Sequence, residues 1–190
     1  HGKGVEKNVE TAIFWYKRAA SQGHAYSQTV LGNAYAKGIG VKRNSKTALE
    51  WYRKAAKKEM PEAALKVADA YFEGSGAKQD YKEALKWYKK AAMAGIAKAQ
   101  FRIAQSYAAG LGTKVDLHES CRWLTVALLF SNDMPKVLNA IEMLEKEMSP
   151  EAFSEALEAC EILAEQIKGR VSQRERSLRM NVEDKKNSTG

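Results

Sequence analysis

The composition of this 190-residue chain narrows the kinds of protein it can be. Two cysteines do not make the disulfide framework of a small secreted domain, and no apolar run approaches the ~20 residues of a membrane-spanning helix. The net charge of +8 raises the question of an acidic partner such as nucleic acid. Half of that charge belongs to the segment from Lys168 onward, which has seven basic and three acidic residues.

The four tryptophans lie 36 residues apart. Trp15, Trp51 and Trp87 are each followed by Tyr, two basic residues and two alanines, and Trp123 begins a more divergent copy. A fixed period in this range is typical of a stacked repeat array, in which each repeat buries its apolar side against its neighbours. We therefore predict an all-α array of helical repeats with tryptophans in its core. Trp123 should contribute less than Trp51 and Trp87, because its repeat is degenerate.

A Gly-x-Gly triplet and a helix start recur with the same period. The triplet stands at residues 2–4, 38–40, 74–76 and 110–112, where it predicts a turn. The chain therefore opens in mid-repeat, and we expect part of a repeat to precede it in the parent protein. Each triplet is followed by an N-cap residue whose side-chain oxygen accepts from a backbone N–H. These residues are Asn8, Asn44, Asp80 and Asp116.

Each repeat contains two helices that can be assigned from helical spacing. Helix B begins at the Asn or Asp cap and carries the Trp-Tyr and Ala-Ala pairs, and Gly23 and Gly95 close two of its copies. Helix A carries a small residue beside its core leucine, valine or isoleucine, which allows an aromatic side chain to pack closely. Helix A spans roughly 25–37, 61–73 and 97–109.

The segment after the degenerate repeat predicts a helical cap and a tail. One helix is expected from about Pro135 to Glu147, and Ser149-Pro150-Glu151 starts another that ends near Lys168. The predicted domains are repeats over 1–131, with the first truncated and the fourth degenerate, and capping helices over 132–168. Residues 169–190 lose the apolar periodicity and are predicted to be a charged tail, with an extension of the last helix into part of it left open.

The phased positions resemble the Sel1-like repeat family. One copy carries the family pattern at Ala25, Leu31, Gly32, Tyr35, Gly38, Gly40, Val41, Asn44, Ala48, Trp51, Tyr52, Ala55 and Ala56. The resemblance covers roughly 1–131 and implies a right-handed α/α superhelical solenoid of bacterial type, related to the tetratricopeptide proteins. It also implies a non-catalytic scaffold or adaptor that binds another protein or a peptide.

The resemblance leaves the compartment unknown, with the envelope, periplasm or secretion slightly favoured over the cytoplasm. Secreted members with ascribed penicillin binding carry a cysteine pair in each repeat, and this chain does not. That difference lowers both the secreted and the β-lactamase interpretations. No cofactor, metal ion or small-molecule substrate is expected.

The resemblance places helix A along the concave groove of the solenoid, where a partner binds. The predicted partner-binding residues are therefore outward positions of helix A: Asn33, Lys66, Asp69, Glu73, Arg102 and Gln105. They mix amide groups and charges of both signs, which suits a peptide backbone or charged side chains. Ordinary solvated helix surface explains any single one of them equally well.

Two alternative chemistries have weaker support. Ser75 and Lys78 match the Ser-x-x-Lys pattern of penicillin-binding and β-lactamase enzymes, but they lie in a repeat turn and lack the partner motifs. His118, Cys121 and Cys160 fall short of the ligand set of a zinc site. A disulfide between the two cysteines stays open for an oxidising compartment. No nucleophile is paired with a base in a readable pattern, so an enzyme is not expected.

A ridge of basic residues on helix B, which we call the basic ridge, is the last candidate binding surface. Such a ridge offers a positive surface to nucleic acid or an acidic partner, but basic residues in this pattern more commonly form a solvated face that keeps the protein soluble. Nucleic acid is therefore a minor alternative. The basic ridge comprises Lys17, Arg18, Arg53, Lys54, Lys57, Lys58, Lys86, Lys89 and Lys90.

Overall fold

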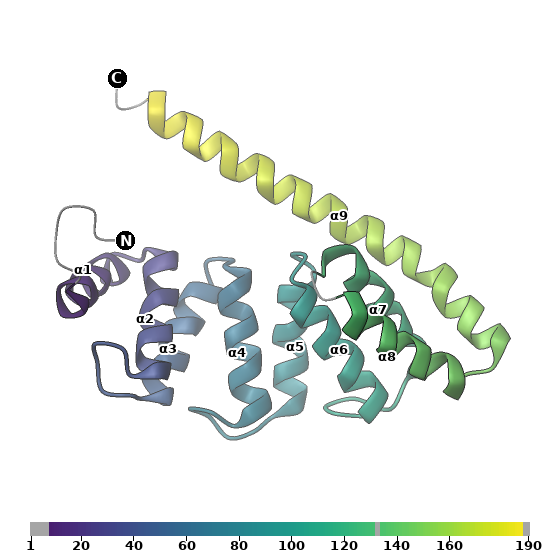
Figure 1. Cartoon of the computed structure of the whole chain (residues 1–190). Helices are drawn as coiled ribbons and strands as arrows, with labels where there is room; N and C mark the ends of the chain where they lie inside the picture. Colours follow the sequence, from purple (N-terminus) through teal and green to yellow (C-terminus); the bar gives the residue numbers. More distant parts are fainter. Residues whose placement is uncertain (1–7, 132–133, 188–190) are drawn as a thin grey trace. The chain divides into compact units, whose positions relative to one another are not determined.

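The computed structural model describes residues 8–131 and 134–187, and all regular structure within these ranges is α-helical (Figure 1). The predicted all-α class is confirmed. The chain divides into two compact units, His1–Tyr88 and Lys89–Gly190, and each is described by itself. The helices are α1 (Val9–Ser21), α2 (Ala25–Lys37), α3 (Ser45–Ala56), α4 (Pro61–Glu73), α5 (Tyr81–Ala92), α6 (Ala97–Ala109), α7 (Leu117–Phe130), α8 (Met134–Glu147) and α9 (Pro150–Asn187).

The predicted N-caps of helix B are present in all four copies, α1, α3, α5 and α7. Each cap side chain accepts a hydrogen bond of 2.9–3.0 Å from the backbone N–H three residues later. The caps thereby satisfy N–H groups that the first turn of a helix leaves without partners. The local sequence around each Asn or Asp is therefore sufficient to start helix B.

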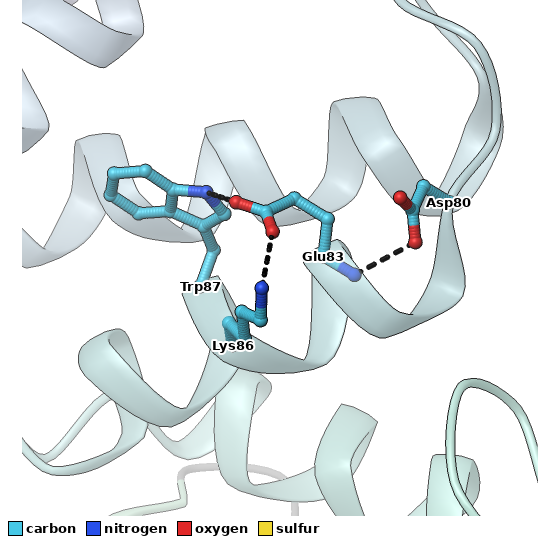
Figure 2. A network of polar contacts seen from close by, with 4 residues as sticks. All are labelled: Asp80, Glu83, Lys86 and Trp87. Atoms are coloured by element: carbon cyan, nitrogen blue, oxygen red, sulfur yellow. Dashed lines mark hydrogen bonds and ion pairs between the residues drawn. The ribbon is translucent and has the colours of Figure 1, made fainter.

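In α5 the cap leads into a side-chain network (Figure 2). Glu83 follows the cap residue Asp80, and its carboxylate accepts from Trp87 Nε1 and from Lys86 Nζ, both at 3.0 Å. This network fixes the indole ring at the edge of the first unit. In α7 the equivalent carboxylate of Glu119 pairs with Arg122 instead, and the indole Nε1 of Trp123 is buried without a hydrogen-bond partner in the described part of the chain.

Helix A has the predicted bounds in all three copies, α2, α4 and α6. Each copy ends at a glycine in the left-handed conformation, and the glycine N–H donates to the carbonyl four residues back. Pro61 is the first residue of α4, where its missing N–H removes no helical hydrogen bond. The Gly-x-Gly triplet at residues 2–4 lies outside the described residues.

Close packing of α2 on α3 depends on one glycine. Tyr52 of α3 is buried, and a Cβ atom on Gly32 of α2 would overlap its ring. Two apolar clusters form part of the core of this unit. Trp51 packs against the first and Trp87 against the second. The first cluster is Ile13, Ala20, Leu31 and Ala34, and the second is Ala48, Leu49, Tyr52 and Val67.

The predicted ranking of the tryptophans is wrong. Trp123 is the most buried, with 5% of its surface exposed, whereas Trp51 and Trp87 are only partly buried and Trp15 is 55% exposed. The prediction took a degenerate repeat as a sign of poor packing. In the second unit, however, α6, α8 and α9 all contact α7, so the helix that carries Trp123 is surrounded.

The last helix is longer than predicted. Instead of ending near Lys168, α9 continues as one helix of 38 residues to Asn187 (Figure 1). No proline follows Pro150, and most residues beyond Gly169 are good helix formers. Val171 and Phe130 both pack over Gly95, so the helix still contacts its unit after Lys168. Loss of apolar periodicity marks the end of the buried stretch and not the end of the helix.

None of the helices in the described ranges combines the length and the apolarity that crossing a membrane requires. The predicted domain boundaries after residues 131 and 168 stay predictions.

Candidate functional site

The outward side of helix A in the first unit consists of two matching stripes, which we call the helix A face. Residues spaced by four, three and four lie on one side of a helix. In both stripes the first and fourth side chains are exposed and the second and third are half-buried. The helix A face comprises Tyr26, Val30, Asn33 and Lys37 on α2, and Glu62, Lys66, Asp69 and Glu73 on α4.

Tyr52 of α3 joins the two stripes. Its hydroxyl donates to Asn33 Oδ1 on α2 at 2.9 Å. Burial and, to a lesser extent, the nearby negative charge of Asp69 on α4 raise the pKa of Tyr52 to about 12. Asp69 also accepts from the Tyr88 hydroxyl at 2.8 Å. The tyrosines of helix B therefore hold Asn33 and Asp69 in place, and both residues belong partly to the core.

The other predicted partner-binding residues divide between the units. Lys66 is half-buried and Glu73 is exposed, and both lie on the α4 stripe with Asp69. Arg102 and Gln105 lie on α6 in the second unit, where Arg102 Nη1 donates to Gln105 Oε1 at 3.1 Å. The structure therefore gathers four of the six residues on the helix A face of the first unit. Their role in binding stays a prediction.

The sequence prediction missed the apolar part of this face. Tyr26, with 58% of its surface exposed, and Val30 stand on α2 at the positions that Glu62 and Lys66 occupy on α4. The 36-residue alignment was sufficient to find them, because each lies 36 residues before its α4 counterpart. The hydrogen bond of Tyr52 to Asn33 and the effect of the Asp69 charge on Tyr52 had no such signal, because they depend on how three different helices pack.

The basic ridge is partly occupied by contacts within the chain. In the first unit Arg53 lies over the ring of Tyr71 at 5.3 Å and Lys54 over that of Trp51 at 4.2 Å. In the second unit Lys89 donates to the Tyr107 hydroxyl at 2.9 Å. Cation–π contacts of this kind stabilise a fold by about 0.5–1 kcal/mol each at exposed sites. Several ridge residues therefore have a structural role of their own.

The contacts of Ser75 and Lys78 fit a turn. The backbone N–H of Ser75 donates to the Ala70 carbonyl at 2.8 Å and so completes the end of α4. Gly74, the residue before it, has the left-handed conformation of a helix end. The Lys78 side chain is exposed.

The two cysteines lie in neighbouring helices of the second unit. Cys121 on α7 and Cys160 on α9 are buried free thiols, and burial raises the pKa of both. The side chain of Thr125, whose hydroxyl donates to the Cys121 carbonyl at 3.0 Å, opposes that shift. His118 is exposed and lines a shallow hollow with Glu147. Within the described ranges no three His, Cys, Asp or Glu side chains are grouped so that they could hold a metal ion.

Comparison with protein families gives one match. The model of the family described as Sel1 repeat matches residues 1–24, 25–59, 61–96 and 97–128. These segments agree with the 36-residue period, and each later one begins at the first residue of a helix A. A comparison with curated protein sequences gives no significant match.

Solved structures of the same kind are similar to this chain. A Sel1 repeat protein from Oxalobacter formigenes has 33% sequence identity over 78% of this chain and 69% of that chain, with a TM-score of 0.65. The protein c5321, a protective antigen present in uropathogenic Escherichia coli strains and displaying an SLR fold, has 26% identity and a TM-score of 0.57. That alignment covers 90% of this chain but 43% of c5321, so this chain spans less than half of it.

Cysteine-rich protein B of Helicobacter pylori shares the fold alone, at 19% identity and a TM-score of 0.54 over 72% of this chain and 99% of that chain. These neighbours place the fold in the class of helical solenoids. Sel1 repeat proteins generally act as scaffolds for protein–protein interaction and are typically non-catalytic. From the family match over four consecutive segments and the similarity to solved Sel1 repeat structures, we conclude that this chain belongs to the Sel1 repeat family.

Proposed function

We propose that this protein is a non-catalytic scaffold that binds a segment of another protein on the helix A face. The observation that carries the proposal is the arrangement around Tyr52. Its hydroxyl holds Asn33 of α2 and feels the charge of Asp69 of α4, and both helices pack on α3, so the two stripes are positioned before a partner arrives. A preorganised surface loses little conformational entropy on binding, which favours affinity.

The chemistry of the face indicates the kind of segment. Tyr26 and Val30 offer apolar contact area on α2, and an exposed aromatic residue is a common anchor in interfaces. The α4 stripe adds Lys66 and three carboxylates, of which those of Glu62 and Glu73 are exposed. Because exposed ion pairs contribute little affinity, we expect the charges to orient the partner and the apolar pair to hold it. A segment with an apolar residue near a basic one fits this face.

The test reverses two charges on the face without changing the net charge. The variant Lys66→Glu with Glu73→Lys is compared with a control, Lys46→Glu with Glu50→Lys, which reverses two exposed charges on α3 in the same unit. Asn33 and Asp69 are left intact because tyrosine hydroxyls donate to them. Each protein is used for affinity capture from source-cell extract after circular dichroism and urea unfolding have shown that it folds.

We expect one partner to be captured by the native chain and by the control and lost from the variant. A benzophenone amino acid at position 66 should cross-link to that partner, and one at position 46 should not. If variant and control capture the same set, the helix A face is not the binding site. Hydrolysis of a chromogenic β-lactam by the native chain but not by Ser75→Ala would contradict the non-catalytic part of the proposal.

A further inference from the structure

Cys160 lies in the middle of the buried stripe of α9. The stripe recurs at helical spacing, and each of its side chains is at most 8% exposed. Val171, one turn beyond it, packs over Gly95 together with Phe130, the last residue of α7. Because α9 contacts α7, the stripe faces that helix. It comprises Ala156, Cys160, Leu163, Ala164 and Ile167.

Cys121 faces away from the contact between α7 and α6. Ser120 is directed toward α6, because its hydroxyl donates to the Ala104 carbonyl at 2.9 Å. Successive residues of a helix point about 100° apart, so Cys121 is turned away from that contact. Its side chain is nevertheless fully buried. In the described structure the other helices that contact α7 are α8 and α9, so one of these two covers the thiol.

The two cysteines stand at nearly the same level along α7 and α9. Phe130 and Val171 meet over Gly95, which gives a common reference point. Cys121 precedes Phe130 by nine residues, and Cys160 precedes Val171 by eleven. At about 1.5 Å per residue these are axial distances of about 14 and 17 Å, which differ by about 3 Å. Short links join α8 to both helices, which is typical of antiparallel neighbours, so α7 and α9 run in the same direction.

The side chain of Thr125 lies beside both thiols. Thr125 follows Cys121 by one turn of α7, and its hydroxyl donates to the Cys121 carbonyl at 3.0 Å. Burial raises the pKa of both thiols, and the Thr125 side chain opposes that rise at Cys121 and also at Cys160 on α9. A negative charge on Cys160 adds to the rise at Cys121. The two thiols therefore face each other between α7 and α9.

We propose that Cys121 and Cys160 are a disulfide site that fastens α9 to α7. The oxidant is itself a disulfide, either a small one such as oxidised glutathione or that of an oxidoreductase. The Cys160 thiolate attacks one sulfur of this reagent and releases the first reagent thiolate. The Cys121 thiolate then attacks the Cys160 sulfur and releases the second. The two protons that the cysteines lose pass to the reagent thiols, so the pair is oxidised by two electrons and the reagent is reduced.

The surroundings of the thiols set the order of attack. Cys160 is the more accessible of the two, at 7% against 0% exposed. Burial and the charge of Glu161 raise its pKa, and the positive charge of Arg122 opposes that rise. Cys160 is therefore the attacking thiol, and Cys121 beside it resolves the mixed disulfide. Because both thiols are well covered, the reaction proceeds when α9 opens locally from α7 or before the chain has folded.

The test equilibrates the full chain with a buffer of reduced and oxidised glutathione. Equilibrium is approached from the reduced folded chain and from chain refolded out of urea, so that slow access to buried thiols does not decide the result. Trapping with iodoacetamide and intact-mass measurement then separate the internal disulfide from glutathione adducts and from the reduced chain. The matched control, Leu157→Cys with Cys160→Ala, moves the thiol by about one turn along α9 to an exposed position.

We expect the folded chain to form the internal disulfide, with the link mapped to Cys121 and Cys160 by peptide analysis. At equal buffer composition the ratio of cross-linked to reduced chain should be about thirtyfold or more higher in the folded protein than in denaturing urea, because a native disulfide favours the fold by such a factor. The control should collect glutathione adducts instead. The cross-linked chain should melt about 4–16 °C higher and lose this gain on reduction.

Glutathione adducts without an internal link in the folded chain overturn the proposal, and so does an equal ratio in the folded and the unfolded chain. A link between two chains, or one that forms as readily in the Leu157→Cys control, shows that the thiols do not face each other. Hydrogen exchange tests the effect on α9, whose amides should exchange more slowly in the cross-linked chain. Unchanged exchange contradicts the fastening of α9. The outcome is separate from that of the proposed function, since the helix A face belongs to the first unit.

Discussion

The Trp-Tyr pair of the third repeat shows that neighbouring aromatic residues differ in structural weight, because Tyr88 is fully buried while Trp87 beside it is only partly buried. Trp123 is buried as well, in a helix that three others contact. We predict that Trp123→Ala lowers the free energy of unfolding by about 3–5 kcal/mol, as truncation of a buried aromatic residue does. Trp15→Ala, the exposed counterpart, should cost less than about 1 kcal/mol.

Urea unfolding followed by circular dichroism measures both values. If the two variants lose the same free energy, burial at these positions does not determine stability. Trp123→Phe adds a second check. Because the indole Nε1 is buried without a partner in the described structure, losing it removes an unsatisfied donor and should cost much less than the alanine substitution.

Tyr52 gives the stability a pH dependence of definite sign. Burial and the charge of Asp69 raise its pKa from 10.0 to about 12, so the native state keeps a proton that the unfolded chain has released. This contribution is fully present below pH 10 and is lost as the pH rises through 12, by at most about 3 kcal/mol. Tyr52→Phe lacks both the titrating group and the hydrogen bond to Asn33.

We therefore expect Tyr52→Phe to be about 1 kcal/mol less stable than the native chain at pH 7, because a hydrogen bond is lost. Between pH 10 and 12 this difference should shrink and then reverse. Free energies of unfolding measured across that range for both proteins provide the check. Parallel pH profiles would show that the Tyr52 hydroxyl is not held as the structure has it.

At the scale of helices and turns, the second glycine of the Gly-x-Gly triplet carries the tighter constraint. Gly74 and Gly76 both have left-handed backbones, at φ 71° and 83°. A Cβ on Gly74 would meet its nearest neighbour at 3.4 Å, whereas one on Gly76 would overlap the backbone carbonyl of Ser45 at the start of α3. Gly74→Ala should cost about 1–2 kcal/mol for the backbone conformation alone. Gly76→Ala should cost clearly more, because a backbone carbonyl cannot swing aside. Thermal unfolding of the two variants decides the order.

The turn after α3 holds one non-glycine residue, Glu59, in a strained left-handed backbone conformation that a substitution can relieve. Gly23 and Gly95 adopt left-handed conformations after two copies of helix B, and Glu59 takes the same role after α3 with φ 58°. Glu59→Gly should raise the free energy of unfolding by about 0.5–1 kcal/mol, since relief of the left-handed conformation exceeds the extra entropy of glycine in the unfolded chain. A lower melting temperature for this variant would contradict the assignment.

The elements that local signals define were predictable, and those that distant contacts define were not. Caps such as Asn44 and terminal glycines such as Gly38 act within one turn, so the bounds of helix A followed from the sequence. The length of α9 and the burial of Trp123 depend on helices that are far away in the sequence. The positions of the helix A face followed from the period, but the hydrogen bonds of Tyr52 to Asn33 and of Tyr88 to Asp69 did not.

At the scale of the whole molecule, the net charge of +8 determines how strongly and in what way the chain binds nucleic acid. Binding to single strands usually combines phosphate contacts with bases stacked on exposed aromatic rings. Here the ring of Trp51 is covered by Lys54 and that of Tyr71 by Arg53, so these aromatic faces are already in use. Around these ridge residues of α3, phosphate neutralisation is the contribution that remains, and it depends on salt and not on sequence.

We therefore predict weak binding to a labelled 20-nucleotide single strand at 50 mM salt that disappears by about 200 mM. Lys57→Gln with Lys58→Gln removes two exposed ridge charges and should reduce the slope of log K against log salt by about 1.4, or 0.7 for each phosphate released. Fluorescence anisotropy over a salt series measures that slope. Binding that persists at 200 mM and weakens in Trp51→Ala would mean that the rings stack on bases after all. In that case the partner of this positively charged chain would be a nucleic acid and not a protein segment.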